Sequence, residues 1–242
     1  MKRKGTFDVY VGDELFTLER TLFLRQSTFF REAVKKAEDR LSKGEALEPI
    51  DLHDESYAST AKPEDFAIYV EFFKSGDVAI PTDENTWVFL TRFWALCYQL
   101  GDFTAANRAM DAILDETKEK NITPDLNDVI EIYAFRGLHI DCPLKRLIVD
   151  FQIHEPDDLL TEPFNERPDR HYEVFIDFLQ DVALEFRSLA RSNQPRGRFL
   201  GDDDLFKQRF STRDKCRYHE HDDDHPESDC TERSSGEDSE EA

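Results

Sequence analysis

The stretch FDVYVGDELFTLERTLFLRQSTFF, residues 7–30, decides the fold predicted for this chain. Its first five residues alternate between apolar and more polar side chains, which is the pattern of a half-buried strand. Gly12 and Asp13 then supply turn residues, and residues 15–18 return as the partner strand of a hairpin. Apolar residues recur at helical spacing from Phe30 onward. We therefore predict a hairpin that leads into a helix.

The residues that follow predict a short strand and further helices. We expect a charged loop over residues 37–48 and a third strand over residues 49–52. Pro63 opens a helix, because proline suits the first helical turn, and Gly76 ends it. Beyond Gly76 we predict a strand-like piece at residues 78–80 and two helices with apolar stripes over residues 89–100 and 105–113.

Together these motifs resemble a BTB/POZ domain. The residues that match the opening of that family without a gap are Asp8, Val9, Phe16, Leu18, Arg20, Leu22, Ser27, Phe29 and Phe30. The stretch FFKSGDV, residues 72–78, is similar to the family's aromatic-x-x-Gly-x-hydrophobic signature. The resemblance covers residues 7–117 and implies an α+β fold in which a short three-stranded sheet packs with helices. Because BTB domains bind proteins and carry no active site, it also implies a protein–protein interaction module, a scaffold or an adaptor such as those of ubiquitin ligases.

Three of the matching residues, Asp8, Arg20 and Ser27, are candidate interaction residues. In the zinc-finger-linked branch of the family, the residues that correspond to Asp8 and Arg20 form a charged pocket near the dimer interface. The alternative is an ordinary ion pair between the strand and the helix. Glu19 stands where the family usually has histidine, which reverses a charge and puts any histidine-dependent contact in doubt.

The length of the segment ahead of Phe7, six residues, bears on the partners that the resemblance implies. BTB domains that exchange strands in a homodimer carry an extra helix and strand at this place, so we expect no dimer of that kind. The short form looks like the adaptor subunits of ubiquitin ligases and the tetramerising channel domains. Such adaptors bind a cullin scaffold, which here would contact residues 26–50. Self-association and a cullin scaffold are the two partner classes that follow.

A helical extension is predicted over residues 118–191. Apolar stripes at helical spacing run over residues 129–133, 144–151 and 175–186. The run PLKRLIVD, residues 143–150, looks like the helical extension of small fungal BTB proteins. Three prolines mark residues 155–170 as an exposed loop between helices.

From residue 192 onward, the composition becomes acidic and rich in serine. Residues 201–242 hold 15 Asp and Glu against 6 Lys and Arg. A segment with so little apolar area cannot offset the conformational entropy that ordering would remove. We predict a largely disordered acidic tail over residues 192–242, with room for one ordered segment.

Four side chains of the kind that bind metals lie within 15 residues of this tail: Cys216, His219, His221 and Cys230. Two thiolates and two imidazoles suit tetrahedral zinc, and small fungal BTB proteins often end in a similar segment. However, the spacing is not that of a known zinc finger, and the acidic run Asp222–Asp224 is equally typical of a solvated segment. Zinc binding and a disordered tail with free thiols stay as alternatives. The first would make the chain a metal-binding regulatory protein, which is our second function hypothesis.

The net charge of −22 disfavours nucleic acid and anionic membranes as partners, because both repel an acidic protein. No apolar run reaches the ~18 residues of a membrane span. The basic arm at residues 1–6 has no apolar segment behind it, so we expect no signal peptide. The four cysteines favour reduced thiols. We therefore expect an intracellular protein of the cytoplasm or nucleus.

The sequence contains no constellation of catalytic residues. It has no glycine-rich phosphate loop and no serine in a nucleophile elbow. The histidines outside the tail are scattered along the chain. We therefore expect no enzyme activity, and zinc is the one cofactor that the sequence suggests.

Overall fold

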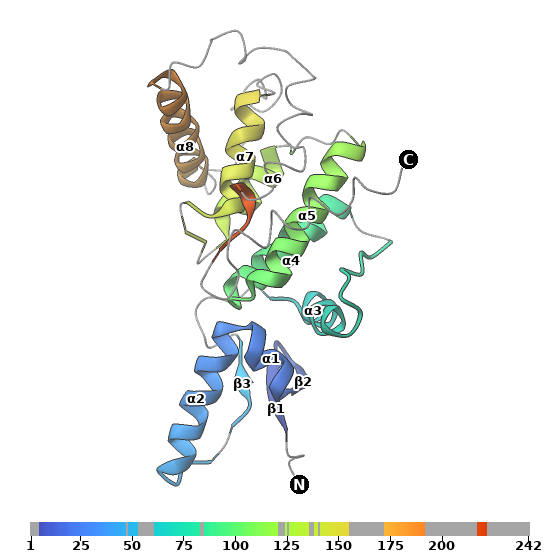
Figure 1. Cartoon of the computed structure of the whole chain (residues 1–242). Coiled ribbons are helices and arrows are strands. Elements are labelled where there is room, and N and C mark those ends of the chain that lie inside the picture. The colour runs from blue at the N-terminus through green and yellow to red at the C-terminus, as the bar shows by residue number, and fades with distance from the viewer. Residues whose placement is uncertain are drawn as a thin grey trace. The chain divides into compact units, whose positions relative to one another are not determined.

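The computed structural model describes residues 5–46, 48–52, 61–82, 85–120, 124, 126–135, 138–139, 141–154, 172–191 and 217–221. The chain divides into two compact units, unit 1 (Met1–Met110) and unit 2 (Asp111–Ala242). Helix α5 (Phe103–Lys120) contributes residues to both units. Figure 1 labels the elements of each unit along the chain.

A three-stranded sheet in the order β2-β1-β3 opens unit 1. Strands β1 (Thr6–Val11) and β2 (Glu14–Glu19) pair antiparallel, whereas β3 (Ile50–Asp51) pairs parallel to β1. The turn of the hairpin has a positive φ of 58° at Gly12, a conformation that glycine adopts without strain. The predicted hairpin and third strand are thus present, and the chain belongs to the mixed α+β class.

Two helices follow the hairpin, α1 (Arg20–Gln26) and α2 (Thr28–Ser42), with Ser27 between them. Ser27 has extended backbone angles and caps α2, because its hydroxyl accepts a hydrogen bond from the Phe30 N–H at 3.2 Å. Helix α2 continues to Ser42, so the loop predicted over residues 37–48 is wrong in its first half. The charged residues there lie on a solvated end of the helix, which needs no apolar stripe.

The start of α2 packs closely on the turn between α4 (Thr86–Gln99) and α5. The Ser27 hydroxyl donates to the Leu100 carbonyl at 2.6 Å, and the Thr28 N–H donates to the Gly101 carbonyl at 3.2 Å. A Cβ atom on Gly101 would lie 1.8 Å from Thr28 Oγ1, so glycine is what allows the two segments to approach.

Helix α3 (Pro63–Ser75) ends at Gly76, whose φ of 80° closes the helix as predicted. Residues 78–80 belong to no strand of the described sheet, so the strand-like prediction there is wrong. Ile80 is 41% exposed, which shows that the apolar alternation at this place has no buried face to pack against.

Aromatic side chains dominate the core of unit 1. Phe23 of α1 and Phe30 of α2 meet edge to face with 6.0 Å between ring centroids, and Phe30 meets Phe66 of α3 in the same way at 6.4 Å. This arrangement suits the quadrupoles of the rings. Helix α4 completes the core with Trp87, Phe89, Phe93, Trp94 and Cys97, all buried, and the prediction that Cys97 is a core residue is confirmed.

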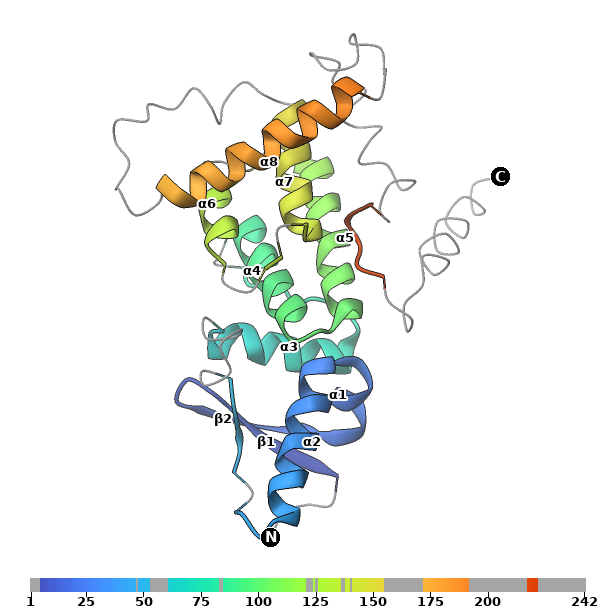
Figure 2. The ribbon, with the colours of Figure 1, turned by 90° about the vertical axis from the view of Figure 1, so that its left-hand side faces the viewer.

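Unit 2 contains the predicted helices α6 (Leu126–Ala134), α7 (Pro143–His154) and α8 (Tyr172–Arg191). Figure 2 shows α8 running across α6 and α7. The Tyr133 hydroxyl of α6 donates to Asp181 Oδ2 of α8 at 2.9 Å, and its ring lies 5.5 Å from that of Phe178. The loop predicted over residues 155–170 and most of the predicted tail lie outside the described residues, whereas the segment 217–221 is described.

Candidate functional site

The two charged residues of the predicted interaction site, Asp8 and Arg20, do not pair with each other in the described part of unit 1. Asp8 faces Thr17 across the hairpin and accepts a hydrogen bond from its hydroxyl at 2.9 Å. Arg20, at the start of α1, reaches Glu38 of α2 at 2.6 Å, and the two side chains are 40% and 53% exposed. A solvated pair of this kind contributes little to stability. Both residues remain candidates for contact with a partner.

Ser27, the third predicted interaction residue, is 0% exposed. Its hydroxyl donates to Leu100 and accepts from Phe30, as described above, so both of its hydrogen-bonding roles are filled within unit 1. The side chain holds α2 on the turn before α5, and it presents no surface to a partner.

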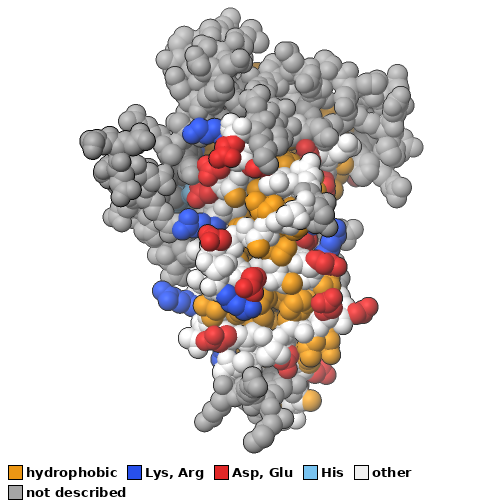
Figure 3. Space-filling view, turned by 90° about the vertical axis from the view of Figure 1, so that its right-hand side faces the viewer, with side chains coloured by type: hydrophobic (Ala, Val, Ile, Leu, Met, Phe, Trp, Pro, Cys, Tyr) orange, Lys and Arg blue, Asp and Glu red, His pale blue; other side chains and the backbone are white. Residues whose placement is uncertain are grey.

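Two apolar side chains on the hairpin are exposed instead. Tyr10 of β1 and Leu15 of β2 lie directly opposite each other, and they are 37% and 53% exposed. Their neighbours Val9, Val11 and Leu18 are buried, so the hairpin buries one face and presents the other to solvent. On the face of the molecule drawn in Figure 3, hydrophobic side chains lie among acidic and basic ones.

Of the predicted zinc ligands, His219 and His221 are described, and Cys216 and Cys230 lie outside the described residues. The two imidazole rings are 6.2 Å apart between centroids. His219 Nε2 lies 3.2 Å from Asp111 Oδ1 of α5. Within the described part of the chain, no three His, Cys, Asp or Glu residues come together as a metal site.

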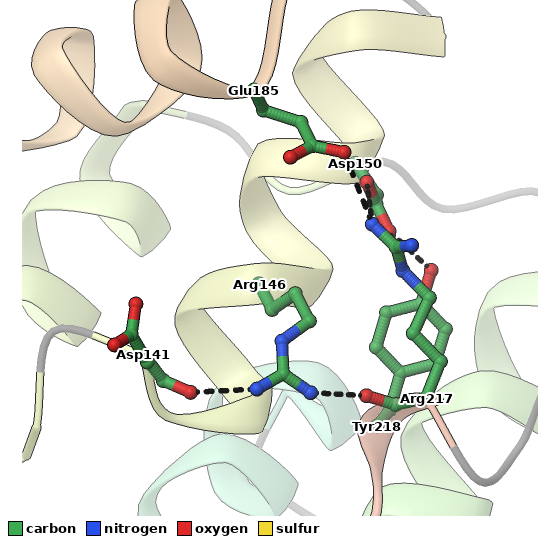
Figure 4. A network of polar contacts seen from close by, with 6 residues as sticks. All are labelled: Asp141, Arg146, Asp150, Glu185, Arg217 and Tyr218. Atoms are coloured by element: carbon green, nitrogen blue, oxygen red, sulfur yellow. Dashed lines mark hydrogen bonds and ion pairs between the residues drawn. The ribbon is translucent and has the colours of Figure 1, made fainter. Parts of the chain in front are cut away.

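The segment 217–221 that carries these histidines lies against helices of unit 2, and its contacts with them form a polar network (Figure 4). Arg146 and Asp150 stand four residues apart on α7, a spacing that places them on the same side of the helix. Arg146 binds the main chain of the segment, and Asp150 binds its side chains. We call the receiving residues Asp111, Arg146, Asp150 and Glu185 the Asp150 site.

Asp150 is the centre of this network. Its carboxylate accepts from Arg217 Nε at 2.7 Å and from Arg217 Nη2 at 2.9 Å, which is the two-pronged geometry that a guanidinium makes with a carboxylate. The Tyr218 hydroxyl donates to the same carboxylate at 2.7 Å. The Asp150 side chain is 2% exposed and Tyr218 is 2% exposed, so the carboxylate has exchanged water for these three donors.

Arg146 holds the main chain of the docked segment. Its Nη1 donates to the Arg217 carbonyl at 2.5 Å, and its Nη2 donates to the Asp141 carbonyl at 2.8 Å. The second contact is made to the chain just before α7, so it orients the guanidinium toward the segment.

Two more acids from other helices face the segment. Glu185 of α8 lies 3.4 Å from Arg217 Nη2, and Asp111 of α5 contacts His219 as described above. Burial alone would lower the pKa of Arg217, but the charge of Asp150 and its hydrogen bonds outweigh burial and raise that pKa above its usual value. The guanidinium is therefore charged at every pH at which the protein is folded.

A buried thiol lies at the start of the same helix. Cys142 is 1% exposed, and burial raises its pKa to about 11. A thiol with such a pKa is neutral near pH 7 and is a poor nucleophile. The chemistry of this region is therefore that of binding through charge and hydrogen bonds.

Sequence reasoning missed Asp150, Arg217 and Tyr218, although one signal was available. Asp150 lies within a run of α7 residues whose neighbours Ile148, Val149 and Phe151 are apolar. A charged residue among core residues is rarely buried without a partner. The partner could not be located, because nothing local relates α7 to a dipeptide 67 residues later in an acidic tail.

Comparison of the chain with protein-family models, with curated proteins and with solved structures finds no match. None of the helices in the described part of the chain is long and apolar enough to cross a membrane. A functional proposal therefore rests on the residues and geometry of this chain.

Proposed function

We propose that this chain is a protein–protein interaction module of the BTB/POZ type, which acts as a scaffold or an adaptor. The observation that carries the proposal is the order of elements in unit 1. A hairpin is followed by two helices divided at Ser27, by a strand parallel to β1, and by helices α3 to α5. The sequence resemblance implies a short three-stranded sheet packed with helices, and this order agrees with it.

Support also comes from the surface of the hairpin. Tyr10 and Leu15 form an exposed apolar pair on a strand face whose other side is buried. Apolar side chains of this kind are common at the centre of protein interfaces. The net charge of −22 favours partners with basic protein surfaces over nucleic acid and anionic membranes. Among partners, self-association is favoured over a cullin scaffold, because the family resemblance is the sole support for a cullin and does not assign the hydrophobic-x-Glu element that cullin binders use to particular residues of this chain.

The test is a charge introduced on the hairpin. Leu15→Glu should abolish self-association of the purified chain, measured by light scattering after size exclusion, and capture of partners by cross-linking and mass spectrometry. Ile80→Glu is a matched control, since Ile80 is an apolar residue of unit 1 that is 41% exposed and lies outside residues 26–50, the predicted cullin contact. Both variants should keep the wild-type helix signal in circular dichroism.

The proposal fails if the wild-type chain stays monomeric at high concentration and if Leu15→Glu captures every protein that the wild-type chain captures. Recovery of a cullin in near-stoichiometric amount would support the adaptor function. It would also make a cullin scaffold, rather than self-association, the favoured partner class.

A further inference from the structure

We propose that the Asp150 site is a peptide-binding site for a basic segment of another protein that presents Arg-Tyr, and that residues 217–221 of this chain occupy the site in cis. This binding site is in unit 2 and goes beyond the interaction surface proposed for unit 1. Its ligand chemistry is visible, because the chain's own segment lies in it.

Recognition of the main chain is the first step of the argument. Arg146 is already oriented by the Asp141 carbonyl, and its free Nη1 meets a carbonyl of the docked segment at 2.5 Å. A donor that is oriented by the receiving helix and binds a ligand's backbone is a feature of peptide-binding sites, because it gives affinity whatever the side chain.

Selection of side chains is the second step. The Asp150 carboxylate binds both prongs of Arg217 and the hydroxyl of Tyr218 at once. Lysine cannot make the two-pronged contact, and phenylalanine lacks the hydroxyl. The site therefore selects two adjacent residues, arginine and tyrosine, because a ligand without either one leaves the buried Asp150 carboxylate short of hydrogen-bond donors.

Charge is the third step, and it points to a ligand in trans. Three carboxylates from three helices, Asp111, Asp150 and Glu185, receive the segment. The chain's own segment continues into Asp222–Asp224, and it belongs to a tail in which acids far outnumber bases. A foreign segment with Arg-Tyr and basic flanking residues would complement the site better than the cis segment does.

Reversibility is the fourth step. The Arg217 side chain is 41% exposed, so water can reach the ion pair while the segment is docked. The segment is tethered by residues 192–216, and a tether of such length gives an effective concentration of about millimolar. The cis segment therefore weakens binding of a peptide in trans without preventing it.

The experiment uses the full-length chain and a labelled synthetic peptide with the sequence of residues 213–221, in which Cys216→Ser removes the thiol. Arg217→Ala/Tyr218→Ala in the protein should empty the site and bind the peptide at least ~10-fold more tightly than wild type, measured by fluorescence anisotropy. Peptides with Arg217→Lys or Tyr218→Phe should bind this variant ~10-fold more weakly. A peptide with lysines added after His221 should bind it more tightly.

Asp150→Asn in the emptied variant should abolish binding. Asp177→Asn is its matched control, because Asp177 is an exposed acid on α8 that the network does not include. Equal binding by the emptied variant and wild type, or equal binding of the substituted peptides, would overturn the proposal.

A second measurement covers the case in which the emptied variant does not fold. A specific protease site inserted within residues 192–216 of the wild-type chain allows the tether to be cut after folding. The released C-terminal fragment should then exchange with the labelled peptide within minutes. A fragment that stays bound for hours would show that the segment is a fixed part of unit 2, and the proposal would be wrong. Both assays use the purified chain alone, so their failure is distinct from failure of the adaptor proposal for unit 1.

Discussion

Ser27 of unit 1 and Asp150 of unit 2 are both buried polar residues that hold a distant piece of chain, but they do so by different chemistry. Ser27 is 0% exposed and binds a main-chain carbonyl 73 residues away. Asp150 is 1% exposed and binds the side chains of Arg217 and Tyr218, 67 and 68 residues away. The first contact is neutral and the second is charged.

This difference separates a packing contact from a selective one. A hydroxyl on a carbonyl depends on the close fit of two backbones, and it is indifferent to salt and to the side chain at Leu100. A carboxylate on a guanidinium depends on charge and on which residue is presented. The Ser27 contact should therefore break by steric change, and the Asp150 contact by loss of charge.

The largest effect should come from a steric change at the Ser27 contact. Gly101→Ala would place a Cβ atom 1.8 Å from Thr28 Oγ1 at a residue with a φ of 61°. We expect a loss of more than about 3 kcal/mol in the free energy of unfolding, measured with chemical denaturant. Gly44→Ala is the control, because Gly44 has a φ of 86° but nothing within 4 Å of the added atom. It should lose about 1 kcal/mol from backbone strain alone, and an equal loss in the two variants would contradict the packing argument.

The next largest effect should come from loss of charge at the Asp150 contact. Arg217→Ala removes two donors from a carboxylate that is 2% exposed. We expect a loss of about 2 kcal/mol, below the usual value for a broken buried pair, because Arg217 is 41% exposed and Asp150 gains water when the segment leaves. Salt at 0.5 M should reduce the difference between variant and wild type. Arg187→Ala, at an exposed residue of α8, should change stability by less than about 0.5 kcal/mol.

Removal of the Ser27 hydroxyl should cost less than the steric change beside it. Ser27→Ala leaves the Leu100 carbonyl and the Phe30 N–H without this partner, so we expect a loss of about 1–2 kcal/mol. In contrast to Arg217→Ala, the loss should be the same in low and high salt. Ser42→Ala, at an exposed serine, serves as the control and should have little effect. A salt-dependent loss at Ser27 would remove the distinction between the two contacts.

The buried Cys142 thiol predicts that the free energy of unfolding depends on pH above pH 8. The pKa of Cys142 is about 11 in the folded chain, because of burial, against 9.0 for an ordinary thiol. Since the unfolded chain loses this proton first, the free energy of unfolding falls as pH rises from 9 toward 11. Between pH 8 and pH 10, wild type should lose about 1 kcal/mol more than Cys142→Ala. Parallel pH profiles of the two proteins would show that the thiol does not contribute.

The smallest effect should be that of zinc. His219 already contacts Asp111, and this contact competes with a site formed by Cys216, His219, His221 and Cys230. We expect wild type purified under reducing conditions to hold as little zinc as a Cys216→Ser/Cys230→Ser variant, measured by mass spectrometry of the metal. Stoichiometric zinc in wild type that is lost in the variant would instead establish the Cys/His site.

Features set by neighbouring residues could be predicted from the sequence. The hairpin follows from period-two alternation around Gly12, and the end of α3 follows from Gly76. Helices α4 to α8 follow from apolar stripes. The division at Ser27 was missed because one helix was predicted after the hairpin, and the cap became evident only from the contact of Ser27 with the Phe30 N–H.

Pairings between distant residues could not be predicted in the same way. Asp8 and Arg20 were predicted as a pair from their positions in the motif, but the strand register places Asp8 opposite Thr17, and Glu38 of α2 pairs with Arg20. The four tail residues predicted to bind metal were chosen by side-chain type alone. In the structure, the tail residues that contact α7 are Arg217 and Tyr218, because the Asp150 carboxylate binds both of them. Periodicity reports which face of an element is buried, and it carries no information about what arrives from elsewhere in the chain.

The distance along the chain between Asp150 and its partners has a consequence for synthesis on the ribosome. The last residues of unit 1 precede Arg217 by more than a hundred positions, so unit 1 can fold while the rest of the chain is still being made. The carboxylate of Asp150 must wait for 67 further residues before Arg217 exists, which takes about 3–13 s at the usual rate of elongation. During that interval, Asp150 on α7 has no guanidinium to bind. A chaperone with a basic or aromatic contact surface would therefore be able to bind the nascent chain at this helix, whereas unit 1 would need no such help.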